Sequence, residues 1–234
     1  MASNYNPSIV TSGLVLALDA GNTKSYPGSG TTWTDLSGNG NTGTLSNGPT
    51  YSSSNGGAIV FDGTNDYVAT ATATALGLSS VATPFTISSW FKTSGSGEYY
   101  LFDNYDNNGL LEDISFRVDG GVMEIYMHAS TSGDTGTLRF GSGYNNNAWH
   151  NFVMTWNGSN TISGYADGTL IGSTTSYTFS GSFDSGTAFW IGQRPGSPAV
   201  WFPGSIAVTH FYNTALTAAQ VLQNFNALRG RFGL

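Results

Sequence analysis

The sequence contains no cysteine, which excludes disulfide bonds, thiolate nucleophiles and cysteine-ligated zinc. Charge is also scarce: 9% of the 234 residues are charged, and 7 basic residues against 14 acidic ones give a formal net charge of −7. The chain therefore lacks the basic surface that phosphate backbones require. We expect no nucleic-acid partner.

Long apolar runs are missing too. No stretch approaches the roughly 20 apolar residues of a membrane-spanning helix, and the first ten residues (MASNYNPSIV) lack the basic and apolar regions of a secretory signal. We expect no membrane partner and synthesis in a cytosol. Only three histidines are present and no Gly-x-Ser-x-Gly motif opens a helix, so no Ser-His-Asp triad is expected.

The sequence is rich in glycine, serine, threonine and asparagine, which favour turns and strands over helix interiors. Its 14% aromatic content supplies a core. Short alternating apolar runs between turn residues predict an all-β fold of two sheets with about thirteen strands. These strands are expected at 13–18, 58–61, 67–69, 85–93, 99–103, 114–118, 122–128, 137–140, 151–156, 161–166, 169–174, 188–192 and 204–212.

Local signals add a hairpin and a helix. Asp167-Gly168 separates two strands by the two residues that a tight β-hairpin prefers. Thr217-Ala-Ala-Gln220 matches a capping box and precedes apolar residues at helical spacing, which predicts one short C-terminal helix lying on the sandwich. Residues 28–57 are interpreted as a long loop. We expect a flexible N-terminal arm at 1–8 and a single domain at 9–234.

The segment from Val122 to His128 places its methionines and isoleucine on one face and Glu124, Tyr126 and His128 on the other. This pattern predicts an open sheet face. A glycosidase needs two suitably spaced carboxylates, but the three glutamates do not alternate with another acid along one strand, and Glu112-Asp113 reads as a polar turn. We therefore expect a protein that is not an enzyme.

Two acidic segments offer oxygen ligands to a hard cation such as calcium. The first contains Asp62 and Asp66, and the second contains Asp103 and Asp106. Neither matches the twelve-residue calcium loop, and Asp and Asn side chains that stabilise turns are the favoured explanation of both segments. Asp19 and Asp35 are weaker candidates.

Sugar binding is the other option for an open face, because aromatic rings beside amide and carboxylate groups combine stacking with directional hydrogen bonds. The aromatic candidates are Trp33, Tyr100, Tyr105, Tyr126, Tyr144 and Trp201. For any single one of them, packing in the core or at a sheet edge is the favoured role. The ligand-binding residues we predict are Tyr126, Trp201, Tyr105 and Arg194.

Four segments carry a resemblance that covers nearly the whole chain. They are FDGTNDYV (61–68), FTISSWFK (85–92), WHNFVMTW (149–156) with YADG (165–168), and GSIAVTHFYNTALT (204–217). In order and spacing they resemble the laminin G-like, concanavalin A-like sandwich domains. The resemblance implies a jelly roll of two antiparallel sheets, one of them concave, with ligands bound at rim loops or in the concavity.

That family includes the pentraxins, whose calcium site is similar to a pair of loops here. Asp103-Asn104 matches its first part, but Ile191-Gly-Gln193 is followed by Arg194 where acidic ligands would be expected. The resemblance therefore implies a structural ion near Asp62 and Asp66, or none.

The flanking segments 9–21, 25–33, 35–41 and 224–233 look like laminin G-like proteins of tailed bacteriophages. This implies a virion structural protein, as a capsid decoration or a tail or fibre appendage, on the virion surface and assembled in the host cytoplasm. Its partners would be capsid or tail proteins, with homo-oligomers as one arrangement. The alternative is a carbohydrate-binding adhesin that recognises host surface glycans, and the third hypothesis is a glycoside hydrolase or lyase.

Overall fold

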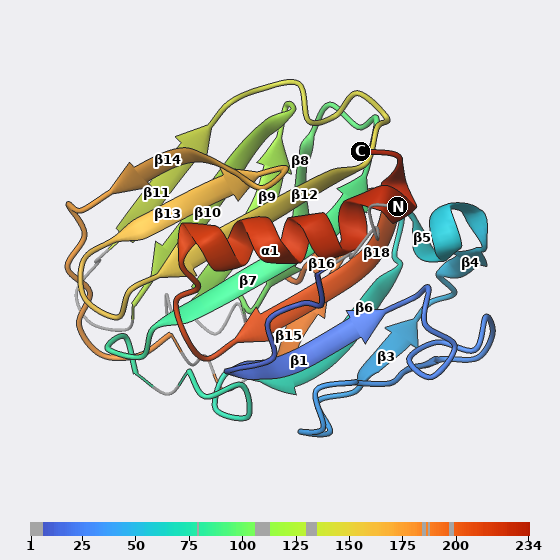
Figure 1. Ribbon diagram of the computed structural model, residues 1–234, viewed down its shortest axis with the longest axis horizontal. Helices are drawn as coiled ribbons and strands as arrows, with labels where there is room; N and C mark the ends of the chain where they lie inside the picture. The colour runs from blue at the N-terminus through green and yellow to red at the C-terminus, as the bar shows by residue number, and fades with distance from the viewer. Residues whose placement is uncertain are drawn as a thin grey trace, which may run out of the picture.

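The computed structural model describes residues 7–78, 80–105, 113–129, 135–183, 186, 188–196 and 199–234. Two packed sheets form the body of the molecule (Figure 1). Sheet A consists of β1 (Leu14–Asp19), β4 (Thr50–Ser52), β5 (Ala58–Asp62), β7 (Phe85–Lys92), β12 (His150–Trp156), β13 (Ile162–Ala166), β14 (Thr169–Thr174) and β18 (Pro203–Tyr212).

Sheet B also has eight strands, and every strand pair described in either sheet is antiparallel. Its strands are β2 (Thr32–Trp33), β3 (Gly43–Ser46), β6 (Tyr67–Thr72), β8 (Glu98–Asp103), β9 (Asp113–Asp119), β10 (Val122–His128), β11 (Thr135–Phe140) and β15 (Ala188–Ile191). A separate pair is formed by β16 (Gln193–Arg194) and β17 (Val200–Trp201). The expected all-β sandwich of two antiparallel sheets is confirmed.

The expectation of a continuous loop at residues 28–57 is wrong. This stretch contains β2, β3, β4 and the short 3-10 helix η1 (Ser54–Gly56). The strands are two to four residues long and rich in Gly, Ser and Thr, so they show little apolar alternation. Strands β3 and β4 form because β6 and β5 supply their hydrogen-bonding partners, and β2 pairs in turn with β3. Local sequence does not carry this information.

The core lies between the two sheets and follows the period-2 pattern expected from the sequence. In β7, Phe85, Ile87 and Phe91 are buried in this core while Trp90 points to the other side of sheet A. Phe116 of sheet B stacks on Phe152 of sheet A with 4.2 Å between ring centroids. The hairpin between β13 and β14 is also confirmed, because Asp167 and Gly168 both have positive φ, at 49° and 78°.

Helix α1 (Ala218–Leu228) lies across the outer face of sheet A, as Figure 1 shows. Its N-terminus has the predicted capping box between Thr217 and Gln220. Trp90 stacks on Phe225 of α1 at 5.5 Å and on Phe232 at 4.2 Å between ring centroids. Phe232 ends the 3-10 helix η2 (Arg229–Phe232). The C-terminal segment therefore covers sheet A, which confirms the predicted position of the helix.

The N-terminal segment is attached to the same helix. The Gln223 side chain donates to the Ser8 carbonyl at 2.8 Å, and the Val10 N–H donates to Asn224 Oδ1 at 2.7 Å. Most of the predicted arm, residues 1–6, lies outside the described residues.

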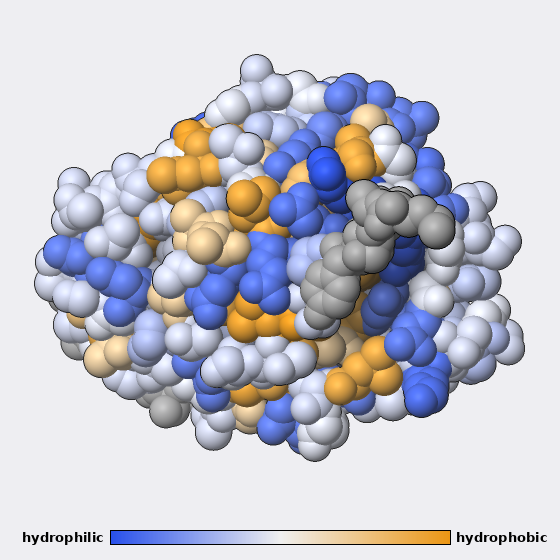
Figure 2. Space-filling view, viewed as in Figure 1, coloured by the Kyte–Doolittle hydropathy of each residue, from blue (hydrophilic) through white to orange (hydrophobic). Residues whose placement is uncertain are grey.

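On this side of the molecule, apolar side chains form small groups among polar ones (Figure 2). No helix in the described part of the chain is long and apolar enough to cross a membrane.

Replacing Phe232 by alanine should lower the free energy of unfolding by about 3 kcal/mol, because a buried ring that stacks on Trp90 is lost and a cavity remains. The measurement is urea denaturation followed by tryptophan fluorescence. Leu234→Ala is the matched control, since the Leu234 side chain is 47% exposed and its truncation should change stability little. Equal effects of the two substitutions would show that Phe232 does not fasten the C-terminal segment.

Candidate functional site

Among the residues that the structure describes, no helix covers the outer face of sheet B, and many ionisable side chains gather there. We call it the polar face and define it by the outward side chains of β8 to β11: Glu98, Tyr100, Asp103, Asp113, Ser115, Arg117, Asp119, Glu124, Tyr126, His128 and Arg139. The pair β16–β17, with Arg194 and Trp201, lies beside β8 at one side of this face.

A β-bulge in β8 shapes the polar face. The register against β9 shifts between Tyr100 and Phe102, so that Leu101 and Phe102 are both in the core. The bulge thereby leaves Tyr100 and Asp103, three residues apart, on the outward side. Strict alternation through this strand would have placed them on opposite faces.

Arg117 links the strands of the polar face. Its Nη1 donates to Tyr100 Oη at 2.7 Å and to Glu98 Oε1 at 3.0 Å. Its Nε donates to Glu124 Oε1 at 3.0 Å, and its Nη2 donates to the same oxygen. Arg139 donates to the second oxygen of Glu124. The Glu124 side chain is 1% exposed, and two arginines compensate its buried charge.

Two aspartates, Asp103 and Asp113, lie close together on the polar face, on either side of Ser115. Ser115 Oγ donates to Asp103 Oδ2 and lies 3.4 Å from Asp113 Oδ2, and the Tyr105 N–H donates to Asp103 Oδ1 at 2.7 Å. Alternation along a single strand does not reveal this pair, because Asp103 is on β8 and Asp113 is on β9. Asp113 also begins a strand rather than lying in a turn, and Glu112 is outside the described residues.

Burial, and then the charge of Asp113, raises the pKa of Asp103 to about 8, although Ser115, the Tyr105 N–H and Arg194 oppose the shift. Asp103 is therefore largely protonated at neutral pH. This protonation lets the two carboxyl groups share one site without two adjacent buried negative charges.

The half-buried residues of the polar face are the ones a ligand can contact. Tyr126 lies beneath the Arg117 guanidinium, at 5.7 Å from its ring centroid. The guanidinium of Arg194 lies 4.2 Å from the Tyr105 ring centroid and 5.5 Å from that of Tyr100. Burial, and then the nearby Asp113 charge, raises the pKa of Tyr126, while Arg117 and Arg194 oppose the shift.

Arg194 differs from the other arginines of the site. Arg117 and Arg139 each bind carboxylates, whereas the Arg194 side chain has no hydrogen bond or ion pair to another residue that the structure describes, although the charges of Asp103 and Asp113 act on it. Its Nε is buried without a partner. Its position is held by the two tyrosine rings through cation–π contacts. The two terminal nitrogens of its guanidinium therefore remain available to a ligand, whereas the buried Nε does not.

The four predicted ligand-binding residues are all half-buried. The structure brings Tyr126, Tyr105 and Arg194 together on the polar face, and Trp201 lies opposite Gln193 in the adjoining strand pair. The other aromatic candidates separate: Trp33 and Tyr100 are fully buried, and Tyr144 packs edge-on against His150 with 5.1 Å between ring centroids. The open sheet face predicted from the segment Val122 to His128 is less exposed than expected. Two of its three outward residues are buried, with Glu124 1% and His128 3% exposed.

The predicted metal ligands are in two places. Asp62 Oδ1 accepts the Thr64 N–H at 2.7 Å, and Asp66 Oδ2 accepts the Asp62 N–H at 3.0 Å, so these carboxylates stabilise their own turn. Asp103 lies on the polar face, and Asp106 lies outside the described residues. Within the described ranges, no group of three or more His, Asp or Glu side chains could hold a metal ion. Calcium binding stays a prediction.

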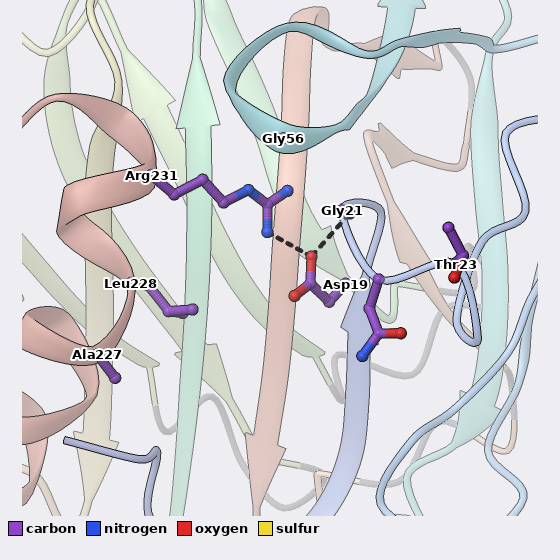
Figure 3. Close-up of a pocket in the computed structure, with 8 residues that line it drawn as sticks. Asp19, Gly21, Thr23, Gly56, Ala227, Leu228 and Arg231 are labelled. Atoms are coloured by element: carbon purple, nitrogen blue, oxygen red, sulfur yellow. Dashed lines mark hydrogen bonds and ion pairs between the residues drawn. The ribbon is translucent and has the colours of Figure 1, made fainter. Parts of the chain in front are cut away.

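A hollow of about 500 Å³ lies away from the polar face, between the end of β1 and the C-terminal segment. Figure 3 shows its charged pair, in which Arg231 Nη1 donates to Asp19 Oδ1 at 2.5 Å. Arg231 also donates to the carbonyls of Asn55 and Gly57. Asp35, the other weak metal candidate, accepts the Ala17 N–H at 2.8 Å. Both aspartates and Arg231 are thus engaged in holding loops, and the polar face is the better candidate site.

The fold and sequence place the chain in a known class. Residues 62–222 match the family model described as the concanavalin A-like lectin/glucanases superfamily, and the chain belongs to this family. No curated protein sequence matches it.

Solved structures of low sequence identity share the fold. The binding domain of Paraclostridial Mosquitocidal Protein 1 is 18% identical with a TM-score of 0.71, and the match covers 92% of this chain and 52% of that one. The binding domain of Botulinum Neurotoxin DC in complex with SialylT is 14% identical with a TM-score of 0.70, over 93% and 52% of the two chains. The chain therefore spans about half the length of these structures, and the predicted concanavalin A-like jelly roll is confirmed.

The raised pKa of Asp103 predicts a pH dependence of stability. Between about pH 4, the ordinary aspartate value, and about pH 8, the folded state keeps a proton that the unfolded state releases, so the contribution of Asp103 to stability falls as pH rises through this window. Asp103→Asn should flatten the curve of unfolding free energy against pH in urea titrations. Asp62→Asn, at an exposed aspartate, should keep the wild-type slope. Parallel curves for wild type and Asp103→Asn would contradict the assignment.

Proposed function

We propose that this domain is a non-enzymatic binding module whose polar face recognises a carbohydrate. The observation that carries the proposal is Arg194, whose unused donors are held in place by two tyrosine rings beside the half-buried Tyr126. A guanidinium that is positioned in advance loses little side-chain entropy when it binds hydroxyl or carboxylate oxygens.

The aromatic residues supply the second part of sugar recognition. Tyr126, Tyr105 and Trp201 each combine a partly exposed apolar ring with a polar group, and sugars present both apolar C–H faces and hydroxyl groups. The ladder of Arg117, Glu124 and Arg139 beneath them holds the strands in register. The site is therefore rigid before the ligand arrives, which favours affinity.

Structures with the same fold agree with this role. Those named above are binding domains, and the printed title of one states that it is in complex with SialylT. A further one concerns botulinum neurotoxin type C, whose cell entry its title describes as dependent on interaction with two ganglioside molecules. Because this chain matches only about half of each structure, glycan binding by this half is our proposal.

The geometry of the acidic pair supports binding over hydrolysis. A glycosidase places its scissile bond between two carboxyl groups. Here Ser115 Oγ occupies the position between Asp103 and Asp113, and these side chains are 0% and 2% exposed. A hydrolase or lyase is therefore the least favoured of the three functions.

An array of defined oligosaccharides, followed by calorimetric titration of the best ligand, tests the proposal. Tyr126→Ala should weaken binding by about 1–3 kcal/mol, the usual effect of removing a central aromatic contact. Arg194→Gln should also weaken binding, because the cationic donors are lost, and circular dichroism should confirm that the variant is folded, since its cation–π contacts with Tyr100 and Tyr105 are lost as well.

The control for this experiment is Tyr51→Ala, which removes a half-buried tyrosine from sheet A and should leave the affinity unchanged. Absence of binding to every oligosaccharide, or equal losses in the Tyr126 and Tyr51 variants, would contradict carbohydrate recognition by the polar face.

We further propose that the module is displayed on the virion of a tailed phage, as a capsid decoration or a tail or fibre appendage assembled in the host cytoplasm. The supporting observation is the position of the flanking segments that resemble phage proteins. Segments 9–21 and 224–233 both belong to the layer around sheet A and α1, away from the polar face. Attachment through this layer to capsid or tail proteins leaves the polar face free for a host surface glycan.

Mass spectrometry of purified particles tests the virion assignment. The protein should be present in fixed stoichiometry with the major capsid or tail proteins and should remain after density-gradient purification. Its presence in the infected-cell lysate together with its absence from the particles would contradict this assignment and leave carbohydrate binding intact.

A further inference from the structure

A histidine on β18 interrupts the apolar packing on the outer face of sheet A. Residues 208, 210 and 212 of this strand alternate outward. Val208 belongs to the apolar cluster that contains Phe225 of α1. Tyr212 belongs to a second cluster, which contains Val221 of α1. His210 therefore lies between two apolar clusters that the helix helps to form.

This part of sheet A is covered by α1, η2 and residues 8–10, which we call the covering layer. Figure 1 shows α1 across the sheet. His210 is 4% exposed, and its imidazole makes no hydrogen bond to any residue that the structure describes. The neighbouring Tyr212 ring lies edge-on to it, at 6.3 Å between centroids. The Tyr212 hydroxyl donates to the Val10 carbonyl and accepts from Asn224 Nδ2, each at 3.0 Å, so the covering layer is fastened beside the histidine.

The charges on the β1 side of His210 are already engaged. Ala17 is its partner in the strand pairing, and Asp35 accepts the Ala17 N–H at 2.8 Å. Asp19 lies two residues further along β1, and its Oδ1 accepts from Arg231 at 2.5 Å. Neither carboxylate forms an ion pair with the imidazole in the part of the chain that the structure describes.

The other elements around His210 offer no anion. On β7 its partner is Ser88, and the charged residue of that strand, Lys92, is a cation. Burial raises the pKa of Tyr212 to about 12, so this neighbour is neutral. Within the covering layer, α1 and residues 8–10 have no ionisable side chain, and η2 contributes two arginines. Burial lowers the pKa of His210 to about 4, although the charge of Asp19 opposes the shift.

We propose that His210 is an acid-sensitive latch, whose protonation releases the covering layer from sheet A while the two-sheet core stays folded. A buried imidazolium without an ion-pair partner is strongly destabilising. Lifting the covering layer hydrates the imidazolium without separating the two sheets. Such local opening involves fewer contacts than global unfolding.

The latch concerns the side of the molecule opposite the polar face and does not depend on carbohydrate binding. Both ends of the described chain are bonded to the covering layer or belong to it. Release of this layer by acid would therefore free the chain ends from the sandwich, while the residues of the polar face stay in place.

The direction of the pH dependence follows from the two states of His210. In the opened state the histidine takes up a proton near pH 6.5, and in the closed state near pH 4. Between these values only the opened state binds the proton, so opening becomes easier as the pH falls. The opening constant should rise about 20-fold from pH 7 to pH 5. Ordinary carboxylates stay largely ionised over this range.

Hydrogen exchange of the intact chain, corrected for the intrinsic exchange rate at each pH, tests the proposal. Amides of residues 218–228 should lose about 20-fold in protection from pH 7 to pH 5, whereas amides of β9 and β10 should keep theirs. His210→Gln should abolish this loss, because the side chain no longer titrates. His210→Phe, which keeps a ring, is the second variant, and circular dichroism melting should confirm that both are folded.

The matched control is His150→Gln, because His150 also belongs to sheet A but is paired with Asp167 at 2.9 Å. This variant should open with acid as the wild type does. Unchanged protection of residues 218–228 between pH 7 and pH 5 overturns the proposal. Equal losses in β9 and β10, which indicate global unfolding, also overturn it, as does a pH dependence that persists in both His210 variants.

Discussion

The buried charge of Glu124 is the constraint on which the arrangement of the polar face depends. A carboxylate that is 1% exposed must be compensated, and Arg117 and Arg139 do so from the strands on either side. Arg117 then has donors left for Tyr100 and Glu98 on the next strand. One guanidinium thus fixes the relative positions of three strands, and the rings that flank the proposed ligand site take their places from it.

The side chains on the outer faces of the two sheets are stabilised in different ways. Sheet A buries its outward Trp90 against Phe225 and Phe232, so its cover is apolar and belongs to the C-terminal segment. Sheet B satisfies its outward side chains with one another, through ion pairs and hydrogen bonds. A face whose polar groups pair with one another needs no covering segment. It can stay accessible to a ligand without exposing a large apolar area. This difference is the physical reason for assigning function to sheet B.

Much of the fold follows from local sequence, whereas the site depends on pairing between distant segments. The Asp167-Gly168 turn, the Thr217 capping box and the alternation in β7 are each determined within a few residues. The β8 bulge and the meeting of Asp103 with Asp113 depend on the register between strands, which no local pattern encodes. The short strands in residues 28–57 were missed for the same reason. Tyr126 and Arg194 were chosen for their chemistry, and the fold brings them close together.

Arg231 joins segments that are far apart in the sequence: it bonds to Asp19 near the start of the chain and to the carbonyls of Asn55 and Gly57. Together with the bonds from Gln223 and Asn224 to residues 8 and 10, it fastens both ends of the described chain to the side of the molecule that carries α1. A larger body joined at either end would meet the domain from behind. A pull exerted through a captured ligand would then be transmitted across the sandwich from sheet B to sheet A, through the packed rings of the core.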